Sequence, residues 1–196
     1  MDTSSFDCMT KKSILLGIFA LSFVVFPLNA VFAKTVPSNL APDVNDWKTY
    51  GTAEVKNHSV NLSGGSSGWA YTDINVEKMR GSYLVLASHA KKSDSRKTSV
   101  DASRSGNPYI YGYLMNSKKK IKNYVTGDTR TTDNVIYTIV PVGSEIKTLR
   151  MFLKQSSVKD VSNKGANVTF SNPVIYSAES EKEAKKLIAV YSQGTL

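Results

Sequence analysis

Hydrophobic and polar residues alternate along most of the chain beyond residue 47, which is the pattern of β-strands with two unlike sides. In IKTLRMFLKQ (146–155), for example, Leu149, Met151 and Leu153 share one side of an extended backbone, and Arg150 lies on the other. About ten such short segments follow at intervals of roughly 8–14 residues, with no helical pattern between them. This spacing predicts an antiparallel β-sandwich or barrel.

A row of tyrosines marks one of the predicted strands. Tyr109, Tyr111 and Tyr113 occupy alternate positions of NPYIYGYLM, so Ile110 and Leu114 point the opposite way. If these two aliphatic residues face the core, the rings face away from it. Because tyrosine has a high β-propensity, one strand of this kind is not by itself a sign of a binding surface.

Two further predicted strands show the same contrast between their sides. Trp69, Tyr71 and Asp73 share one side of WAYTDINV, and Arg150 and Phe152 lie opposite the aliphatic side of IKTLRMFLKQ. Three strands of this kind are more than strand propensity requires, and they predict a shared aromatic face. The alternative is that the tyrosines fill the interior of the sandwich or a contact with the second sheet.

The first 33 residues have the pattern of a secretory signal peptide. Lys11 and Lys12 precede an apolar run that ends in AVFA, with small residues at the two positions that a signal peptidase reads. We expect cleavage after Ala33, and therefore a secreted or cell-surface protein. The alternative is an uncleaved membrane anchor, because about twenty apolar residues can span a bilayer.

The remaining chain has the size of one domain. We expect a loosely attached lead-in at 34–46, a β-sandwich domain at 47–177 and a helical tail at 178–196. In the tail, Glu181 and Lys185 have the i,i+4 spacing of a helical ion pair, and we expect this helix to be solvated. The single cysteine lies in the leader, so the mature domain has no disulfide and depends on its core.

The chain is basic, with a formal net charge of +9. A positive surface favours anionic partners such as acidic glycans, teichoic-type polymers or phospholipid headgroups, and export makes nucleic acid the least favoured. Two basic clusters are either solvated turns or sites of salt-dependent attachment to an anionic polymer. They consist of Lys91-Lys92 with Arg96-Lys97, and of Lys118-Lys119-Lys120 with Lys122.

The sequence contains no catalytic or metal-binding constellation. His58 and His89 are the only histidines, and neither has a metal-ligand spacing such as H-E-x-x-H. SGGSSG lacks the lysine and the helix that complete a phosphate loop. A glycosidase needs two carboxylates at a set separation, and the spacing of the acidic residues singles out no pair. We therefore predict no enzymatic activity. The weakest alternative is a secreted hydrolase whose pair of carboxylates the sequence does not single out.

The chain resembles the galactose-binding-like jelly roll and, within it, the carbohydrate-binding modules of bacterial glycoside hydrolases. The matching stretches are WxxYGTAEV (47–55), VNLSGG (60–65), Trp69-Ala70-Tyr71, GSYLVLASHAK (81–91) and VTFSNPVIY (168–176). In the fourth of these stretches the family usually shows G-x-Y-x-L-S-x-x-A. The resemblance implies a two-sheet sandwich that binds sugar with aromatic side chains, on a concave sheet face or in loops at one edge.

Mapped onto this chain, the resemblance implies a set of sugar-binding residues. Sugar C–H faces pack on rings while hydroxyl groups need planar polar partners. The ligand-binding candidates are Trp69, Tyr71, Tyr109, Tyr111 and Tyr113, with Arg150 as hydrogen-bonding partner and Asn107 near the edge of the row. Many family members carry an Asp in the last strand as part of a structural calcium site, where this chain has Ser171-Asn172. We therefore predict no cofactor, and calcium is not supported.

Together these observations predict an exported, non-catalytic, bacterial-type binding protein with a jelly-roll sandwich. We expect its partner to be a polysaccharide or another cell-surface glycan, anionic glycans included, and we expect membrane contact only through an uncleaved leader. The alternative is a structural or protein-interaction component of the cell envelope or extracellular matrix. Binding modules usually accompany a catalytic domain, and we expect none in this chain, which keeps that alternative open.

Overall fold

The computed structural model describes residues 37–63, 68–93, 107–117, 119–125, 133–155 and 167–194. The predicted signal peptide lies outside the described residues, as do Arg96, Lys97 and Lys118 of the two basic clusters. Within the described part of the chain, no helix combines the length and the apolar character needed to cross a membrane.

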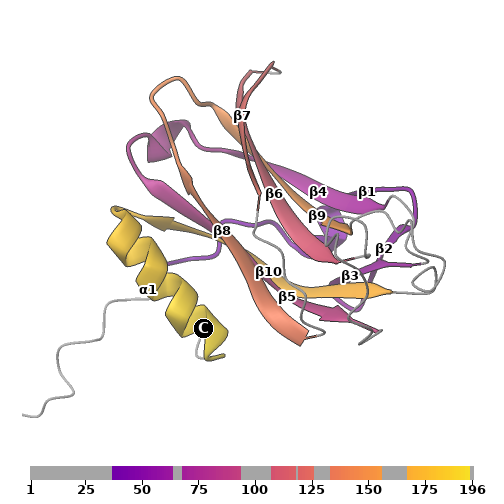
Figure 1. Ribbon diagram of the computed structural model, residues 1–196. Helices are drawn as coiled ribbons and strands as arrows, with labels where there is room; N and C mark the ends of the chain where they lie inside the picture. The colour runs from indigo at the N-terminus through magenta and orange to yellow at the C-terminus, as the bar shows by residue number, and fades with distance from the viewer. Residues whose placement is uncertain are drawn as a thin grey trace, which may run out of the picture. The chain divides into compact units, whose positions relative to one another are not determined.

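Ten strands of the described residues form two antiparallel sheets of five strands each (Figure 1). Sheet A has the order β1-β4-β9-β6-β7, and sheet B has the order β2-β3-β10-β5-β8. The prediction of an antiparallel jelly-roll sandwich followed by a C-terminal helix is confirmed. The strands are β1 (Lys48–Tyr50), β2 (Ala53–Lys56), β3 (Ser59–Leu62), β4 (Trp69–Asn75), β5 (Tyr83–Lys92), β6 (Pro108–Asn116), β7 (Lys119–Val125), β8 (Asp133–Pro141), β9 (Thr148–Gln155) and β10 (Val168–Ala178); the helix is α1 (Glu181–Ser192), and Val44–Asp46 and Glu77–Met79 are 3-10 helices.

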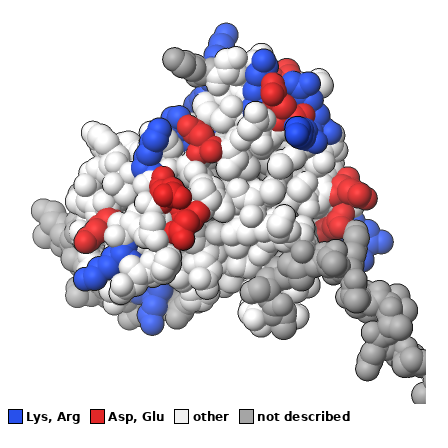
Figure 2. Space-filling view, turned by 180° about the vertical axis from the view of Figure 1, so that it is seen from behind, with Lys and Arg blue, Asp and Glu red and all other residues white. Residues whose placement is uncertain are grey.

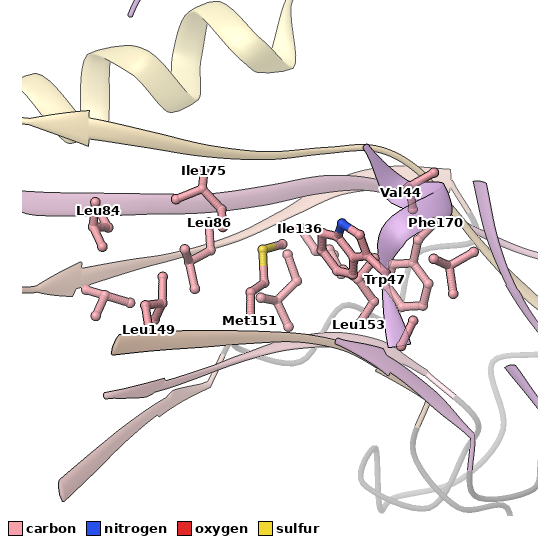
Figure 3. Close-up of a cluster of buried hydrophobic side chains, with 14 of the residues drawn as sticks. Val44, Trp47, Leu84, Leu86, Ile136, Leu149, Met151, Leu153, Phe170 and Ile175 are labelled. Atoms are coloured by element: carbon pink, nitrogen blue, oxygen red, sulfur yellow. The ribbon is translucent and has the colours of Figure 1, made fainter. Parts of the chain in front are cut away.

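The core lies between the two sheets. Leu149, Met151 and Leu153 of β9 have no exposed surface and point from sheet A toward sheet B, where Leu84 and Leu86 meet them (Figure 3). Each such side chain contributes about 1.5–3 kcal/mol when it is fully buried. The aliphatic side predicted for this strand is therefore its core side, and the residues between these three face away from the core.

The tyrosine strand β6 has the same orientation. Ile110 and Leu114 are buried, at 0% and 2% exposure. A Cβ atom built on Gly112 would lie 2.8 Å from Cδ1 of Leu86 and 3.3 Å from a methyl group of Val140, both in sheet B. The inner side of β6 thus has no room for a side chain at this position, and its tyrosines lie on the outer side.

The segment before β1 is an integral part of the domain. The backbone N–H of Leu40 donates to the carbonyl oxygen of Ile175 at 2.8 Å, and Oδ1 of Asn39 accepts from the N–H of Ile175 at 2.9 Å. Val44 and Trp47 are each only 5% exposed and belong to the core cluster. The expectation of a loosely attached lead-in is therefore wrong. The sequence does not show this attachment, because backbone hydrogen bonds and sparse apolar residues leave no periodic pattern.

Strand β10 runs through Ser171 and Asn172 without a break. Its pairing with β5 shifts register between Ser171 and Val174, which marks a β-bulge. Asn172 has a φ of 51°, a conformation that asparagine tolerates better than most residues. The bulge allows Pro173, which has no N–H to donate, to lie within a central strand.

The start of helix α1 is fixed by side-chain hydrogen bonds. The hydroxyl of Ser180 accepts from the backbone N–H of Glu183 at 3.2 Å, and Oε2 of Glu183 accepts from the N–H of Glu179 at 3.0 Å. These bonds satisfy donors that a helix N-terminus leaves without a partner. The expected pair of Glu181 and Lys185 is also present, with 2.6 Å between Oε1 and Nζ.

Helix α1 packs on the outer side of sheet B (Figure 1). Its Ala184 and Ile188 are buried, at 0% and 7% exposure, in a cluster with Val85 of β5 and Tyr176 of β10. The expectation of a solvated helix is wrong, because the sequence shows the apolar stripe of α1 but not the apolar outer side of the sheet that it covers. The outer side of sheet B is therefore occupied by the chain itself over parts of β5, β10 and β8.

Candidate ligand-binding face

Aromatic side chains gather on the outer side of sheet A. All except Tyr50 are partly buried, and Tyr50 has 59% of its surface exposed. This arrangement confirms the prediction that strands with an aliphatic and an aromatic side share one aromatic face. We call this set of seven rings the aromatic face: Tyr50 of β1, Trp69 and Tyr71 of β4, Phe152 of β9, and Tyr109, Tyr111 and Tyr113 of β6.

Strand register brings residues distant in sequence into rows across the sheet. Residues that pair directly in antiparallel strands project from the same side of the sheet. The rows are Tyr50–Trp69–Lys154–Tyr109, Lys48–Tyr71–Phe152–Tyr111 and Asp73–Arg150–Tyr113. Five of the sequence-predicted residues thus lie with Arg150 in one continuous surface.

Five of the rings, from Tyr71 of β4 to Tyr109 of β6, form a continuous chain of contacts. Phe152 lies between Tyr71 and Tyr113, with centroid distances of 5.3 Å and 4.9 Å. Tyr111 contacts Tyr113 at 5.9 Å and Tyr109 at 4.9 Å, the latter edge to face. Such pairs contribute about 0.5–1.5 kcal/mol each beyond the area they bury. The rings therefore hold one another in place before any ligand arrives.

Among the described tyrosines, Tyr109 has the most strongly raised phenol pKa. Burial raises the pKa of its phenol, and the neighbouring hydroxyl of Tyr111 raises the pKa further. The phenol of Tyr109 is therefore protonated at neutral pH and keeps a proton to donate.

The indole of Trp69 offers little free ring surface to a ligand. Tyr50 stacks on it with a centroid distance of 4.2 Å and an interplanar angle of 21°. The ammonium group of Lys154 lies 4.9 Å from the indole centroid. The exposed ring at this corner is therefore Tyr50, which the sequence reasoning did not select because β1 is too short to show alternation.

Arg150 and Asp73 form a bidentate ion pair in the row of the face that ends at Tyr113. Nε of Arg150 lies 2.6 Å from Oδ1 of Asp73, and Nη2 lies 2.7 Å from Oδ2. The hydrogen bonds to Asp73 raise the pKa of Arg150, against the opposing effect of burial. The guanidinium carbon lies 4.5 Å from the centroid of Tyr71. The pair fixes the guanidinium over the rings and leaves some of its five N–H donors for a ligand hydroxyl.

Three lysines also lie against the rings. Nζ of Lys120 is 4.8 Å from the centroid of Tyr113, Nζ of Lys154 is 4.9 Å from that of Trp69, and Nζ of Lys48 is 5.8 Å from that of Tyr71. These are cation–π distances. The parity of Lys154 with Arg150 could have identified it from the sequence, whereas Lys120 reaches the face through a register shift between β6 and β7.

Asn107, the seventh predicted residue, is set apart from the rings. Its side chain is 7% exposed, and its Oδ1 accepts a hydrogen bond from Nζ of Lys92 at 3.4 Å. Lys92 itself is only 6% exposed, so it does not belong to a surface cluster as its position beside Lys91 had indicated. The amide of Asn107 thus has a structural partner, and we leave Asn107 out of the candidate site.

Charge on the surface is mixed in sign. On the side of the molecule shown in Figure 2, Lys and Arg side chains lie among Asp and Glu side chains. Lys147 lies 3.6 Å and Arg80 3.9 Å from the same carboxylate oxygen of Glu77. The net charge of +9 is thus not spread as one basic field over that side.

Metal-ligating groups are scattered in the described part of the chain. None of its His, Cys, Asp and Glu side chains form a group of three or more that could hold a metal ion. At the position compared with the family's calcium site, the carbonyl of Ser171 accepts from the hydroxyl of Ser88 at 3.0 Å, and that of Asn172 accepts from Tyr191 at 2.6 Å. Both carbonyls are therefore engaged within the domain.

No protein-family model matches the chain, and no curated protein matches it in sequence. Several solved structures, carbohydrate-binding modules among them, align with the chain. A family 16 carbohydrate-binding module aligns with a TM-score of 0.46 and 11% identity, over 70% of this chain and 99% of that chain. A family 29 carbohydrate-binding module aligns with a TM-score of 0.41 and 16% identity, over 77% of this chain and 89% of that one.

A longer protein also aligns with the chain. The enzymatically active domain of tailspike protein 4 from bacteriophage CBA120 aligns with a TM-score of 0.48 and 12% identity, over 71% of this chain. The present chain spans only about a fifth of that protein, or 21%. All of these alignments have TM-scores below 0.5, so we argue function from the residues of the aromatic face and not from the similarity.

Proposed function

We propose that this protein is an exported, non-catalytic protein that binds a polysaccharide on the aromatic face of sheet A. The observation that carries the proposal is the contrast between the outer sides of the two sheets. Helix α1 packs on β5, β10 and β8 of sheet B, whereas sheet A carries seven rings in two contacting groups with the Arg150–Asp73 pair beside them. Grouped rings with polar groups between them match the C–H faces and hydroxyls of a sugar chain.

The extent of the face fits a polymer better than a single small molecule. From Tyr50 on β1 to the tyrosines of β6, the rings span three interstrand spacings, or about 14 Å. From Tyr109 to Tyr113 the row covers four residues along β6, again about 14 Å. A ligand that contacts the whole face must be an extended chain of several sugar units.

The five strands of sheet A do not supply the pair of carboxylates that glycoside hydrolysis needs. Asp73 is the only carboxylate in the five strands of sheet A, and Arg150 holds both of its oxygens. Hydrolysis of a glycosidic bond ordinarily requires two carboxylates on opposite sides of that bond. A binding role without catalysis therefore suits these residues.

Polysaccharide pull-down with purified protein tests the proposal. Replacing both Tyr111 and Tyr113 by alanine removes two rings, each contributing about 0.5–1.5 kcal/mol, so the affinity should fall by roughly 5- to 150-fold. The matched control is Tyr137→Ala, which removes an exposed tyrosine, 46% accessible, from β8 of sheet B. Equal losses in both variants, or no binding to any polysaccharide of a broad panel, would contradict the proposal.

Export requires a separate measurement. The signal-peptide pattern predicts a mature chain that begins at Lys34. N-terminal sequencing of protein recovered outside the cytoplasm of an expressing bacterium should therefore start at that residue. Recovery of the full-length chain in the membrane fraction would instead support an uncleaved anchor.

A further inference from the structure

We infer that the aromatic face selects polysaccharides that carry carboxylate groups, such as uronic-acid polymers, and that Lys48, Lys120 and Lys154 bind those carboxylates. This inference rests on the proposed function and names its ligand class. Its basis is the charge of the face and the position of that charge on the rings.

The three lysines have no acidic counterpart in the described residues. None of their ammonium groups lies within ion-pair distance of a described carboxylate, in contrast to Lys147 and Lys185, whose partners lie at 3.6 Å and 2.6 Å. Asp73, the single carboxylate of the sheet A strands, is held by Arg150. The positive charge on this face is therefore available to an anionic ligand.

The position of the ammonium groups favours a charged sugar over a neutral one. Lys154 lies over Trp69 and Lys120 over Tyr113, so part of each ring surface is already occupied by a cation. A neutral sugar has to displace these cations to stack on the same rings. A carboxylate can pair with an ammonium group that stays on its ring, while the sugar C–H face packs on neighbouring rings.

The distribution of the lysines indicates several charges per ligand. They come from β1, β9 and β7, and thus from the two edges and the centre of sheet A. The sheet is about 19 Å wide, or four interstrand spacings. A single acidic sugar cannot reach all three, whereas a chain with carboxylates on many of its units can.

Two pairs of probes test this inference by isothermal titration calorimetry. Polygalacturonate and alginate carry carboxylates, and their fully methyl-esterified forms keep the backbone without the charge. The wild-type protein should bind at least one acidic form tenfold or more tightly than its ester, with an affinity that falls as salt is added. Equal affinity for acid and ester, or no binding to either acid, would overturn the inference.

Two matched triple variants test whether the lysines of the face, and not the net charge of the protein, determine binding of the acidic polysaccharide. The variant with Lys48, Lys120 and Lys154 all changed to glutamine should lose tenfold or more in affinity for the acid and little for the ester. The control changes Lys56, Lys182 and Lys186, which are exposed and lie outside sheet A, and should bind like wild type despite the same loss of charge. Equal affinities of the two triple variants for the acidic polysaccharide would show that the three lysines of the face do not bind its carboxylates.

The outcomes separate this inference from the function on which it rests. If the Tyr111→Ala, Tyr113→Ala variant loses binding to the esters or to neutral polysaccharides while acid and ester bind equally, the binding function holds and the carboxylate selection fails. If the wild-type protein binds no polysaccharide at all, the proposed function itself fails.

Discussion

Gly112→Ala is the substitution that most sharply tests which way the tyrosine strand faces. Gly112 alternates with Tyr111 and Tyr113, so it faces the core only if the rings face outward. The added Cβ would lie 2.8 Å from Cδ1 of Leu86, a residue with no exposed surface. Carbon atoms in contact are ordinarily about 3.5–4.0 Å apart, so one side chain or both strands must move.

The expected cost follows from this contact. Inserting a methyl group into a filled core costs about 1–3 kcal/mol. Replacing glycine by alanine also lowers the entropy of the unfolded chain, which returns about 0.4–1 kcal/mol. The net loss should be about 1–2 kcal/mol, equivalent to a decrease in Tm of about 2–8 °C for a domain of this size.

Urea unfolding measures this loss, and Gly143→Ala is the matched control. A Cβ at Gly143 would also meet an atom at 2.8 Å, but that atom is the carboxylate oxygen of the exposed Glu145, which can rotate away. The control should therefore lie within about 0.5 kcal/mol of wild type. If the two variants are equally stable, Gly112 does not face a filled core and the assignment of the aromatic face is wrong.

Three other substitutions test separate parts of the structure. Tyr191→Phe removes the 2.6 Å hydrogen bond to the carbonyl of Asn172 and should lower the free energy of unfolding by about 1 kcal/mol at pH 8. Burial raises the pKa of Tyr191 to about 12, so the stability that the tyrosine contributes is lost as pH rises from 10 to 12. Urea unfolding should therefore show a smaller stability difference between wild type and variant at pH 11, and a constant difference would refute this. A double-mutant cycle with Asp73→Asn and Arg150→Met should give a coupling of about 0.5–1 kcal/mol, and zero coupling would contradict the bidentate pair. Ile188→Ala should cost about 2–3 kcal/mol by urea unfolding because Ile188 is buried between α1 and sheet B, and a cost below 0.5 kcal/mol would mean that α1 is not packed there.

The two sides of each strand were predictable from the sequence because alternation is a local property. Met151 and Ile110 face the core as their parity required, and the aromatic residues between such positions lie on the outer side. The face as a surface also depends on register, which a single sequence does not contain. Phe152 illustrates this, because only pairing with β4 and β6 places it between Tyr71 and Tyr113.

Features that depend on long-range contacts escaped prediction for a related reason. Lys120 reaches Tyr113 only through the shifted pairing of β7 with β6. The parity of Lys154 places it on the side of Arg150, but its contact with Trp69 depends on the pairing of β9 with β4. Asn39 is attached to the domain by hydrogen bonds to residues more than 130 positions away. Such contacts join residues without any periodic relation, so no pattern in the sequence predicts them.

The affinity of the purified protein for a carboxylated polysaccharide, with and without the rings of Tyr111 and Tyr113, tests the central claim most directly. We expect the double alanine variant to bind roughly 5- to 150-fold more weakly than both wild type and Tyr137→Ala, while urea unfolding shows that it is still folded under the assay conditions despite the loss of its ring contacts. If the double variant retains wild-type affinity, the ligand binds elsewhere and the aromatic face is not its site.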